Sequence, residues 1–275
     1  MALLKKIRSM PLYLLAIIIL VFTGFPFLIM VNSSFKNQYE FMTKPWSLPD
    51  VFTLENYSLI FSSQFFHYFL NSLIVSGISV VIVIVLSAMA SYPLARLKFK
   101  FNKPIFILFL VGMMIPIHTT LIPIYLLTIS LGLYDTIWAL IGPYVAFALP
   151  ISVVIFTMFL KDLPKELEES AKIDGCGHFR LFWKILFPLL TPAVSTVAIY
   201  NFIHMWNEFV FALVLTSSGE NATLPLGLRE FYGEFSVNIP GIMAALTMAS
   251  LPLLLVYLVA QEKIVKGVAA GSVKG

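Results

Sequence analysis

The sequence predicts an all-α protein that crosses a membrane six times. Of its 275 residues 59% are apolar and only 12% are charged, whereas soluble domains carry about 25% charged residues. The mean hydropathy is +0.92. Long runs almost free of charge alternate with short polar or charged segments, and a run of roughly 20 apolar residues crosses a bilayer as a helix. Together these observations favour a polytopic membrane protein.

Six segments have the required length and apolar character. The first follows three basic residues and is too long for a signal-peptide core, so we expect it to be retained. No internal repeat is visible, so we expect a single membrane domain over residues 1–275. The predicted spans cover approximately residues 10–31, 69–94, 104–129, 136–160, 190–216 and 240–260.

Prolines and caps divide the chain further. The first span is expected to bend near Gly24 and Pro26, and the third to be broken up by Pro116 and Pro123, because proline removes a helical hydrogen bond. Between the first two spans, Thr53 is suited to cap a short helix.

The basic residues set the orientation. Fifteen of the eighteen Lys and Arg residues fall in segments on the same side as the N-terminus, and cytoplasmic loops carry such an excess. We therefore expect both termini, and the charged segment 161–189 between spans four and five, to be cytoplasmic.

The segment 161–189 has the pattern of a helix–turn–helix. Pro164 suits a first helical turn, and Gly175 suits a helix end, where a left-handed residue is favoured. A second short helix is expected from His178 to Phe187, ended by Pro188. The charges exclude burial in lipid, while the regular apolar positions favour a docking surface for a cytoplasmic partner.

The sequence lacks the motifs of a catalytic site. It has no Gly-rich phosphate loop, no metal-ligand spacing and no nucleophile turn. We therefore expect no enzyme activity, no metal and no cofactor bound by this chain. The net charge of +4 comes from basic residues at span ends, so it does not indicate nucleic-acid binding. The one cysteine, Cys176, excludes an internal disulfide.

Polar residues within the fifth span are the candidates for a solute path. Asn201, His204 and Glu208 are spaced i, i+3 and i+7, so a continuous helix would place them on one face. Such a face must contact protein or water. It could line a path for a polyhydroxyl solute, or it could form hydrogen bonds between helices. Alternatively, Glu208 and His204 could form the relay of an ion-coupled secondary transporter.

The charged segment resembles the EAA loop of ABC-importer permeases. That pattern appears as Glu169-Ser170-Ala171, Gly175 and Ile185-Leu186-Phe187-Pro188, with Ser170 replacing alanine and Phe187 replacing leucine. Further stretches are similar to the MalG-like permeases of carbohydrate ABC importers: Phe52 to Tyr57, Asn71 to Val75, Trp206 to Phe209, and the tail Gly267 to Gly275.

This resemblance implies a type I importer in the cytoplasmic (inner) membrane of a bacterium or archaeon. The implied partners are a second, MalF-like permease, two copies of a cytoplasmic ABC ATPase that binds ATP and Mg, an extracytoplasmic solute-binding protein and membrane lipid. The resemblance also implies that the first hairpin helix couples to the ATPase, and residues 271–275 are a further candidate contact. The implied coupling residues are Leu167, Glu168, Glu169, Ser170, Ala171, Asp174 and Gly175.

Overall fold

The computed structural model describes residues 2–62, 64–231 and 238–272, so the last part of the tail contact expected at 271–275 lies outside the described residues. The described chain is helical and contains no strand. It falls into two compact units. Unit 1 comprises the described parts of residues 1–66 and 228–251, and unit 2 those of 67–227 and 252–275.

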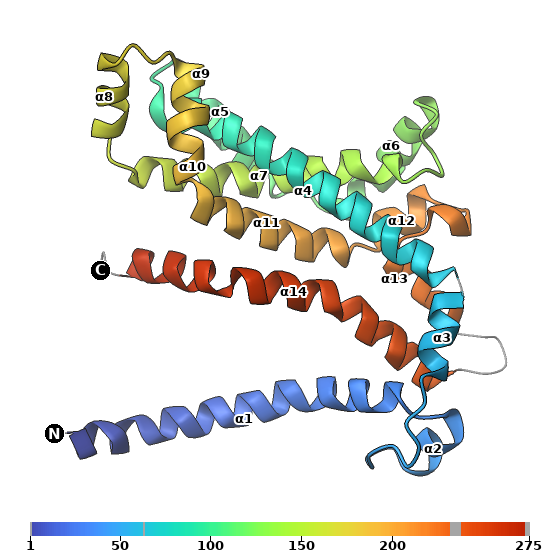
Figure 1. Ribbon diagram of the computed structural model, residues 1–275. Helices are drawn as coiled ribbons and strands as arrows, with labels where there is room; N and C mark the ends of the chain where they lie inside the picture. The colour runs from blue at the N-terminus through green and yellow to red at the C-terminus, as the bar shows by residue number, and fades with distance from the viewer. Residues whose placement is uncertain (1, 63, 232–237, 273–275) are drawn as a thin grey trace. The chain divides into compact units, whose positions relative to one another are not determined.

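Four helices are long and apolar enough to cross a membrane. They are α1 (Ala2–Ser34), α4 (Phe65–Arg96), α7 (Trp138–Asp162) and α14 (Ile239–Ser272) (Figure 1). Helix α1 continues through Gly24 and Pro26 without a break, so the bend expected there stays a prediction.

Two further candidate spans are bent. Helix α5 (Asn102–Gly112) meets α6 (Ile117–Ser130) at 97°, and residues 178–189 meet α11 (Thr191–Trp206) at 73°. Pro116 is the N-cap of α6, which confirms the predicted break there, whereas Pro123 lies inside α6. By length and composition the described chain therefore has four spans, or up to six if each bent pair counts as one.

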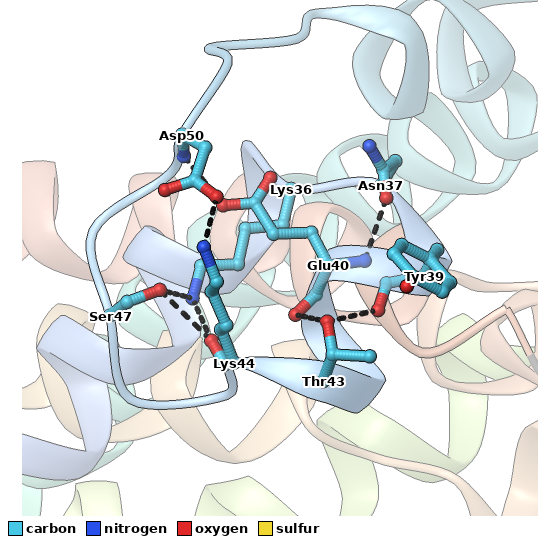
Figure 2. A network of polar contacts seen from close by, with 8 residues as sticks. All are labelled: Lys36, Asn37, Tyr39, Glu40, Thr43, Lys44, Ser47 and Asp50. Carbon is cyan, nitrogen blue, oxygen red and sulfur yellow. Dashed lines mark hydrogen bonds and ion pairs between the residues drawn. The ribbon is translucent and has the colours of Figure 1, made fainter.

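In unit 1 a buried lysine organises the loop after α1 (Figure 2). The Lys36 side chain is fully buried, and its Nζ donates to the carbonyl oxygens of Lys44 at 2.7 Å and Pro45 at 3.3 Å, and to Ser47 Oγ at 3.3 Å. These acceptors offset the cost of removing the ammonium group from water. The loop contains α2 (Gln38–Thr43), which begins at an Asn37 cap.

The remaining helices of unit 1 are short. Helix α3 covers Glu55–Ser62, and η3 covers Leu228–Phe231. Thr53 Oγ1 accepts a hydrogen bond from the Glu55 amide at 3.2 Å. Since Leu54 directly precedes α3, this bond forms a turn before the helix, and the prediction of Thr53 as the cap is wrong.

Unit 2 is built around α7, which packs against α5, α11 and α12 (Val210–Leu215). One face of α4 carries Ser72, Ser76 and Ser79, all buried, and small residues of this kind allow close helix packing. Ser72 Oγ accepts from the amide of Leu224, the first residue of α13 (Leu224–Gly227), which follows η2 (Gly219–Asn221).

The charged hairpin belongs to unit 2. Its first arm is α8 (Glu166–Ile173), and its second arm consists of α9 (His178–Leu181), a π-turn η1 (Phe182–Leu186) and α10 (Phe187–Leu189). The prediction that Pro188 ends the second arm is wrong. A π-turn adds a residue to the helix, and here it lies just before the proline, so the arm continues to Leu189 despite the missing N–H.

Candidate functional site

The turn of the hairpin depends on Gly175. Its φ is +75°, a left-handed conformation that side chains with a Cβ disfavour. The Cys176 amide donates to the Ala171 carbonyl at 2.9 Å, and the Gly175 amide donates to the Lys172 carbonyl at 3.0 Å. This pair of bonds is a Schellman motif. The structure thus confirms the predicted left-handed helix end.

Helix α8 has two different faces. Glu168 and Ala171 are buried, with 7% and 4% of their surface exposed, so they face the rest of this chain. The other predicted coupling residues of the hairpin are exposed: Leu167, Glu169, Ser170, Asp174 and Gly175. Of the implied coupling residues, Ala171 packs into the hydrophobic core of this chain.

Both arms of the hairpin are held by the last turns of α4. Arg96 Nε lies 2.7 Å from Glu168 Oε1, and both side chains are largely buried. The Arg96 guanidinium also donates to the Leu163 carbonyl at 2.8 Å. One turn earlier, Tyr92 Oη is 2.8 Å from His178 Nδ1 on the second arm. Since Tyr92 and Arg96 are four residues apart, they lie on one face of α4, which contacts α8 through Arg96 and α9 through Tyr92.

A cavity of about 390 Å³ lies in unit 2, lined by residues of α7, α11, α12 and the α5–α6 break. Asn201, His204 and Glu208 all line it. Apolar and aromatic side chains make up most of the remaining wall. A concave, largely apolar wall with a few polar groups is typical of sites for small molecules.

Glu208 reaches this cavity in a way that the spacing did not predict. Helix α11 ends at Trp206, so Glu208 is not on one helical face with Asn201 and His204. Its carboxylate accepts from the Phe211 amide at 2.8 Å and from the Ala212 amide at 3.3 Å, which caps the start of α12. Tyr144 Oη donates to Glu208 Oε2 at 2.9 Å. Both carboxylate oxygens therefore already accept hydrogen bonds from this chain, which disfavours a role for Glu208 in an ion relay.

Asn201 and His204 differ in whether their polar atoms already have hydrogen-bond partners. Asn201 is buried, and its amide donates to Ser152 Oγ at 2.9 Å and to the Val197 carbonyl at 2.8 Å. It therefore ties α11 to α7. The His204 ring lies 4.4 Å from the Tyr200 ring, centroid to centroid. Within the described residues His204 has no hydrogen-bond partner, so its ring nitrogens are available to a molecule in the cavity.

Asp135 fastens the loop between α6 and α7 to the loop after α12. Its Oδ1 accepts from the amides of Ser217 at 2.8 Å and Ser218 at 2.9 Å, and Asn221 donates to its carbonyl at 2.7 Å. Burial alone would raise the pKa of Asp135, but the hydrogen bonds from Ser218 and Ser217 outweigh it and lower the pKa below its usual value. No cluster of metal-ligating side chains occurs among the described residues.

Sequence reasoning missed four side chains of these sites. Tyr144 and Tyr200 line the cavity, and Tyr92 and Arg96 hold the hairpin. One signal in the sequence could have indicated the residues that hold the hairpin: Tyr92 and Arg96 form an i, i+4 pair of polar side chains at the end of an apolar span. Arg96 had been interpreted only as an indicator of orientation.

Comparison with known proteins identifies the family. Residues 83–270 match the model of the binding-protein-dependent transport system inner membrane component. The chain is 51% identical to a putative ABC transporter permease protein, ORF2, of Caldicellulosiruptor sp. over 91% of both sequences. It is 33% identical to the melibiose/raffinose/stachyose import permease MelC of Bacillus subtilis over 95% of both.

The fold has a match among solved structures. A chain of a bacterial ABC transporter involved in the import of the acidic polysaccharide alginate superimposes with a TM-score of 0.83 at 19% identity, covering 94% of this chain and 97% of that one. The family model, the relatives and the fold agree: the chain belongs to the binding-protein-dependent transport system inner membrane components, as a multi-pass permease of the sugar ABC transporter type.

Proposed function

We propose that this chain is one of two permease subunits of an ABC importer that takes up a sugar or a related polar solute. In this proposal it spans the membrane six times, with the bent pair α5–α6 as the third span, residues 190–216 as the fifth, and both termini and the hairpin in the cytoplasm. It pairs with a second, MalF-like permease. Two copies of a separate ATPase bind ATP and Mg beneath them, and an extracytoplasmic binding protein delivers the solute. Family membership and the distribution of basic residues support this arrangement.

The hairpin is the proposed link to the ATPase, and the division of α8 into two faces is the observation that carries this step. The exposed residues Leu167, Glu169, Ser170 and Asp174 are free to contact a partner. Glu168, buried against Arg96, holds the same helix to α4. A displacement of the hairpin by the ATPase would therefore be passed to a membrane span directly.

The cavity is the proposed contribution of this chain to the solute path. Its volume of about 390 Å³ falls in the usual range for small-molecule sites. His204 offers unpaired nitrogens, and Tyr200 offers a ring face and a hydroxyl, groups suited to the hydroxyls and apolar faces of a sugar. ATP and loaded binding protein would open and close the path by binding its two states with different affinity.

A matched pair of glycine variants tests the coupling step. Gly175 and Gly177 are both exposed, and an added Cβ at either meets nothing within 4 Å. They differ in φ, which is +75° at Gly175 and −70° at Gly177. Valine should therefore strain only position 175, by at least about 1–2 kcal/mol.

The measurement is purification of the tagged chain from native membranes, with its partners identified and counted. We expect wild type and Gly177→Val to recover a second permease and two ATPase copies. We expect Gly175→Val to keep the second permease and lose the ATPase. Recovery of the wild-type chain alone, still active in transport, would refute the importer. Full ATPase recovery and uptake with Gly175→Val would refute the docking role of the hairpin.

A further inference from the structure

A second cavity of unit 2 lies beside the hairpin and is strongly basic. Its volume is about 520 Å³, and it is formed by the end of α4, the α4–α5 turn, the end of α7 and one face of α8. Five cationic and two anionic side chains line it, an excess of three positive charges. They are Arg96, Lys98, Lys161, Lys165 and Lys172, with Glu168 and Glu169.

The floor of this basic pocket is fixed by one ion pair and by hydrogen bonds. Arg96 is held by Glu168 and by the Leu163 carbonyl. The Asn102 amide donates to the carbonyls of Leu94 at 3.1 Å and Leu97 at 2.9 Å, which fixes the turn that carries Lys98. The pocket is therefore held in shape before any ligand binds.

The lysines at the rim form no ion pair with a described residue, and of the two acids in the lining only Glu169 is left unpaired by Arg96. Glu168, one of the two acids, is committed to Arg96, and Lys98, Lys161, Lys165 and Lys172 form no ion pair within 4 Å among the residues that the structure describes. These four lysines come from three separate elements. Concentrating such charges in one concavity without an anion is unfavourable, so the geometry favours an anionic ligand.

The position of the pocket indicates which anion. Three apolar elements begin or end around it, since α4 ends at Arg96, α5 begins at Asn102 and α7 ends at Asp162. Lys161 Nζ lies 5.3 Å from the centre of the Phe106 ring, one turn inside α5. Span ends lie where the hydrocarbon core meets the headgroup layer, and basic pockets there bind phosphate headgroups.

We propose that this basic pocket binds a phosphate group, supplied by the headgroup of an anionic phospholipid, between the hairpin and the α4–α5 turn. The pocket face of α8 carries Lys165, Glu168, Glu169 and Lys172. It shares Glu169 with the proposed coupling face, whose other residues, Leu167, Ser170 and Asp174, do not line the pocket. The proposal depends only on the pocket lying at span ends, so it holds or fails separately from the coupling role of the hairpin.

The test compares two triple variants with equal loss of charge. Lys98→Gln/Lys161→Gln/Lys172→Gln removes one rim lysine from each element. The control, Lys100→Gln/Lys103→Gln/Lys184→Gln, removes three nearby lysines that do not line the pocket. Each variant, in the assembly with which it purifies, is titrated in detergent with short-chain phosphatidylglycerol, with phosphatidylcholine of equal chain length and with inorganic phosphate. Native mass spectrometry counts bound lipids.

We expect saturable binding of phosphatidylglycerol to wild type and control, weakened about 10-fold to 100-fold in the pocket variant, together with weak binding of phosphatidylcholine. If only a high concentration of inorganic phosphate displaces the bound phosphatidylglycerol, the lipid headgroup is the source of the phosphate group. If inorganic phosphate saturates the pocket at a lower concentration than the lipid does, the ligand is free phosphate, and the lipid assignment is overturned. Equal weakening in both variants would show non-specific attraction and overturn the site. The site would also be overturned if the pocket variant bound lipid like wild type but no longer purified with the ATPase, because the pocket would then be a protein interface.

Discussion

At the scale of single residues, Glu208 separates the two transport mechanisms that the sequence allows. An ion-coupled transporter needs a carboxyl group that gains and loses a proton during transport. Here the carboxylate is occupied as a helix cap and as the acceptor for Tyr144. A glutamine can fill the same position, because its oxygen can accept from the Phe211 amide and the Tyr144 hydroxyl can turn to accept from its amide group.

We therefore expect Glu208→Gln to retain uptake within about threefold, since most of its hydrogen bonds survive. Glu208→Ala should be destabilised, because loss of a helix cap costs about 1 kcal/mol and the Tyr144 hydroxyl, on a residue only 4% exposed, would lose its partner at a further cost of about 1–3 kcal/mol. Uptake and thermal unfolding of the purified assembly measure both effects. Loss of uptake in the glutamine variant with unchanged stability would instead support the ion relay.

At the scale of elements, the Arg96–Glu168 pair joins a span to the hairpin. Removing one member of a buried pair leaves an uncompensated charge, which costs about 3–5 kcal/mol. We expect Arg96→Ala and Glu168→Ala each to destabilise the purified assembly and expose the hairpin to protease. The double variant should be less destabilised than the sum of the two, because neither charge then remains alone.

The same protein provides a control for this cycle. Lys44 Nζ lies 2.6 Å from Asp50 Oδ2, as close as the atoms of a buried ion pair, but the two side chains are 56% and 60% exposed. Exposed pairs contribute little in water, so the cycle at Lys44 and Asp50 should give a much smaller coupling than the cycle at Arg96 and Glu168. If the losses of stability in Arg96→Ala and Glu168→Ala simply add in the double variant, the buried pair is no more strongly coupled than the exposed pair.

The contact of Asp135 with the loop after α12 should depend on pH. The pKa of Asp135 is lowered in the folded chain, so its stabilising effect is complete above the ordinary value of 3.8 and fades as pH falls through the lower folded value. We expect amide exchange at Ser217 and Ser218 to be slow at neutral pH and to accelerate, after correction for intrinsic rates, only below about pH 3.8.

Asp135→Asn is the matched variant for this contact. The φ of Asp135 is +57°, and asparagine tolerates this region, so the substitution removes the charge without adding strain. The variant should exchange faster at neutral pH and lose the acid-dependent change. If its exchange at neutral pH equals that of wild type, the carboxylate does not hold this loop.

At the scale of the whole molecule, the local patterns were sufficient for the apolar segments and for the hairpin. Hydropathy located the four unbroken helices and the bent pair α5–α6, and Gly175 marked the turn because its requirement is local. Contacts between distant residues were not predictable in this way. Arg96 and Glu168 are separated by 72 positions, and nothing in either neighbourhood specifies the other.

The predicted fifth span is not one continuous helix, for the same physical reason. Residues 190–216 are mostly apolar, so their composition favours one helix, yet α11 ends at Trp206. The interruption is stabilised by Tyr144 from α7 and by the capping geometry of Glu208. Tertiary contacts thus override a continuous apolar pattern at the point where the cavity is formed.

The 97° bend between α5 and α6 also bears on how the protein is made. With 11 and 14 residues, the two helices are about 17 and 21 Å long, each too short to cross the roughly 30 Å core of a bilayer alone. Non-helical backbone at the break is tolerated in a membrane only against protein or a cavity, and α5 packs on α7, which follows it in the chain. During synthesis, therefore, the α5–α6 segment can reach its final position in the bilayer only after the ribosome has delivered α7.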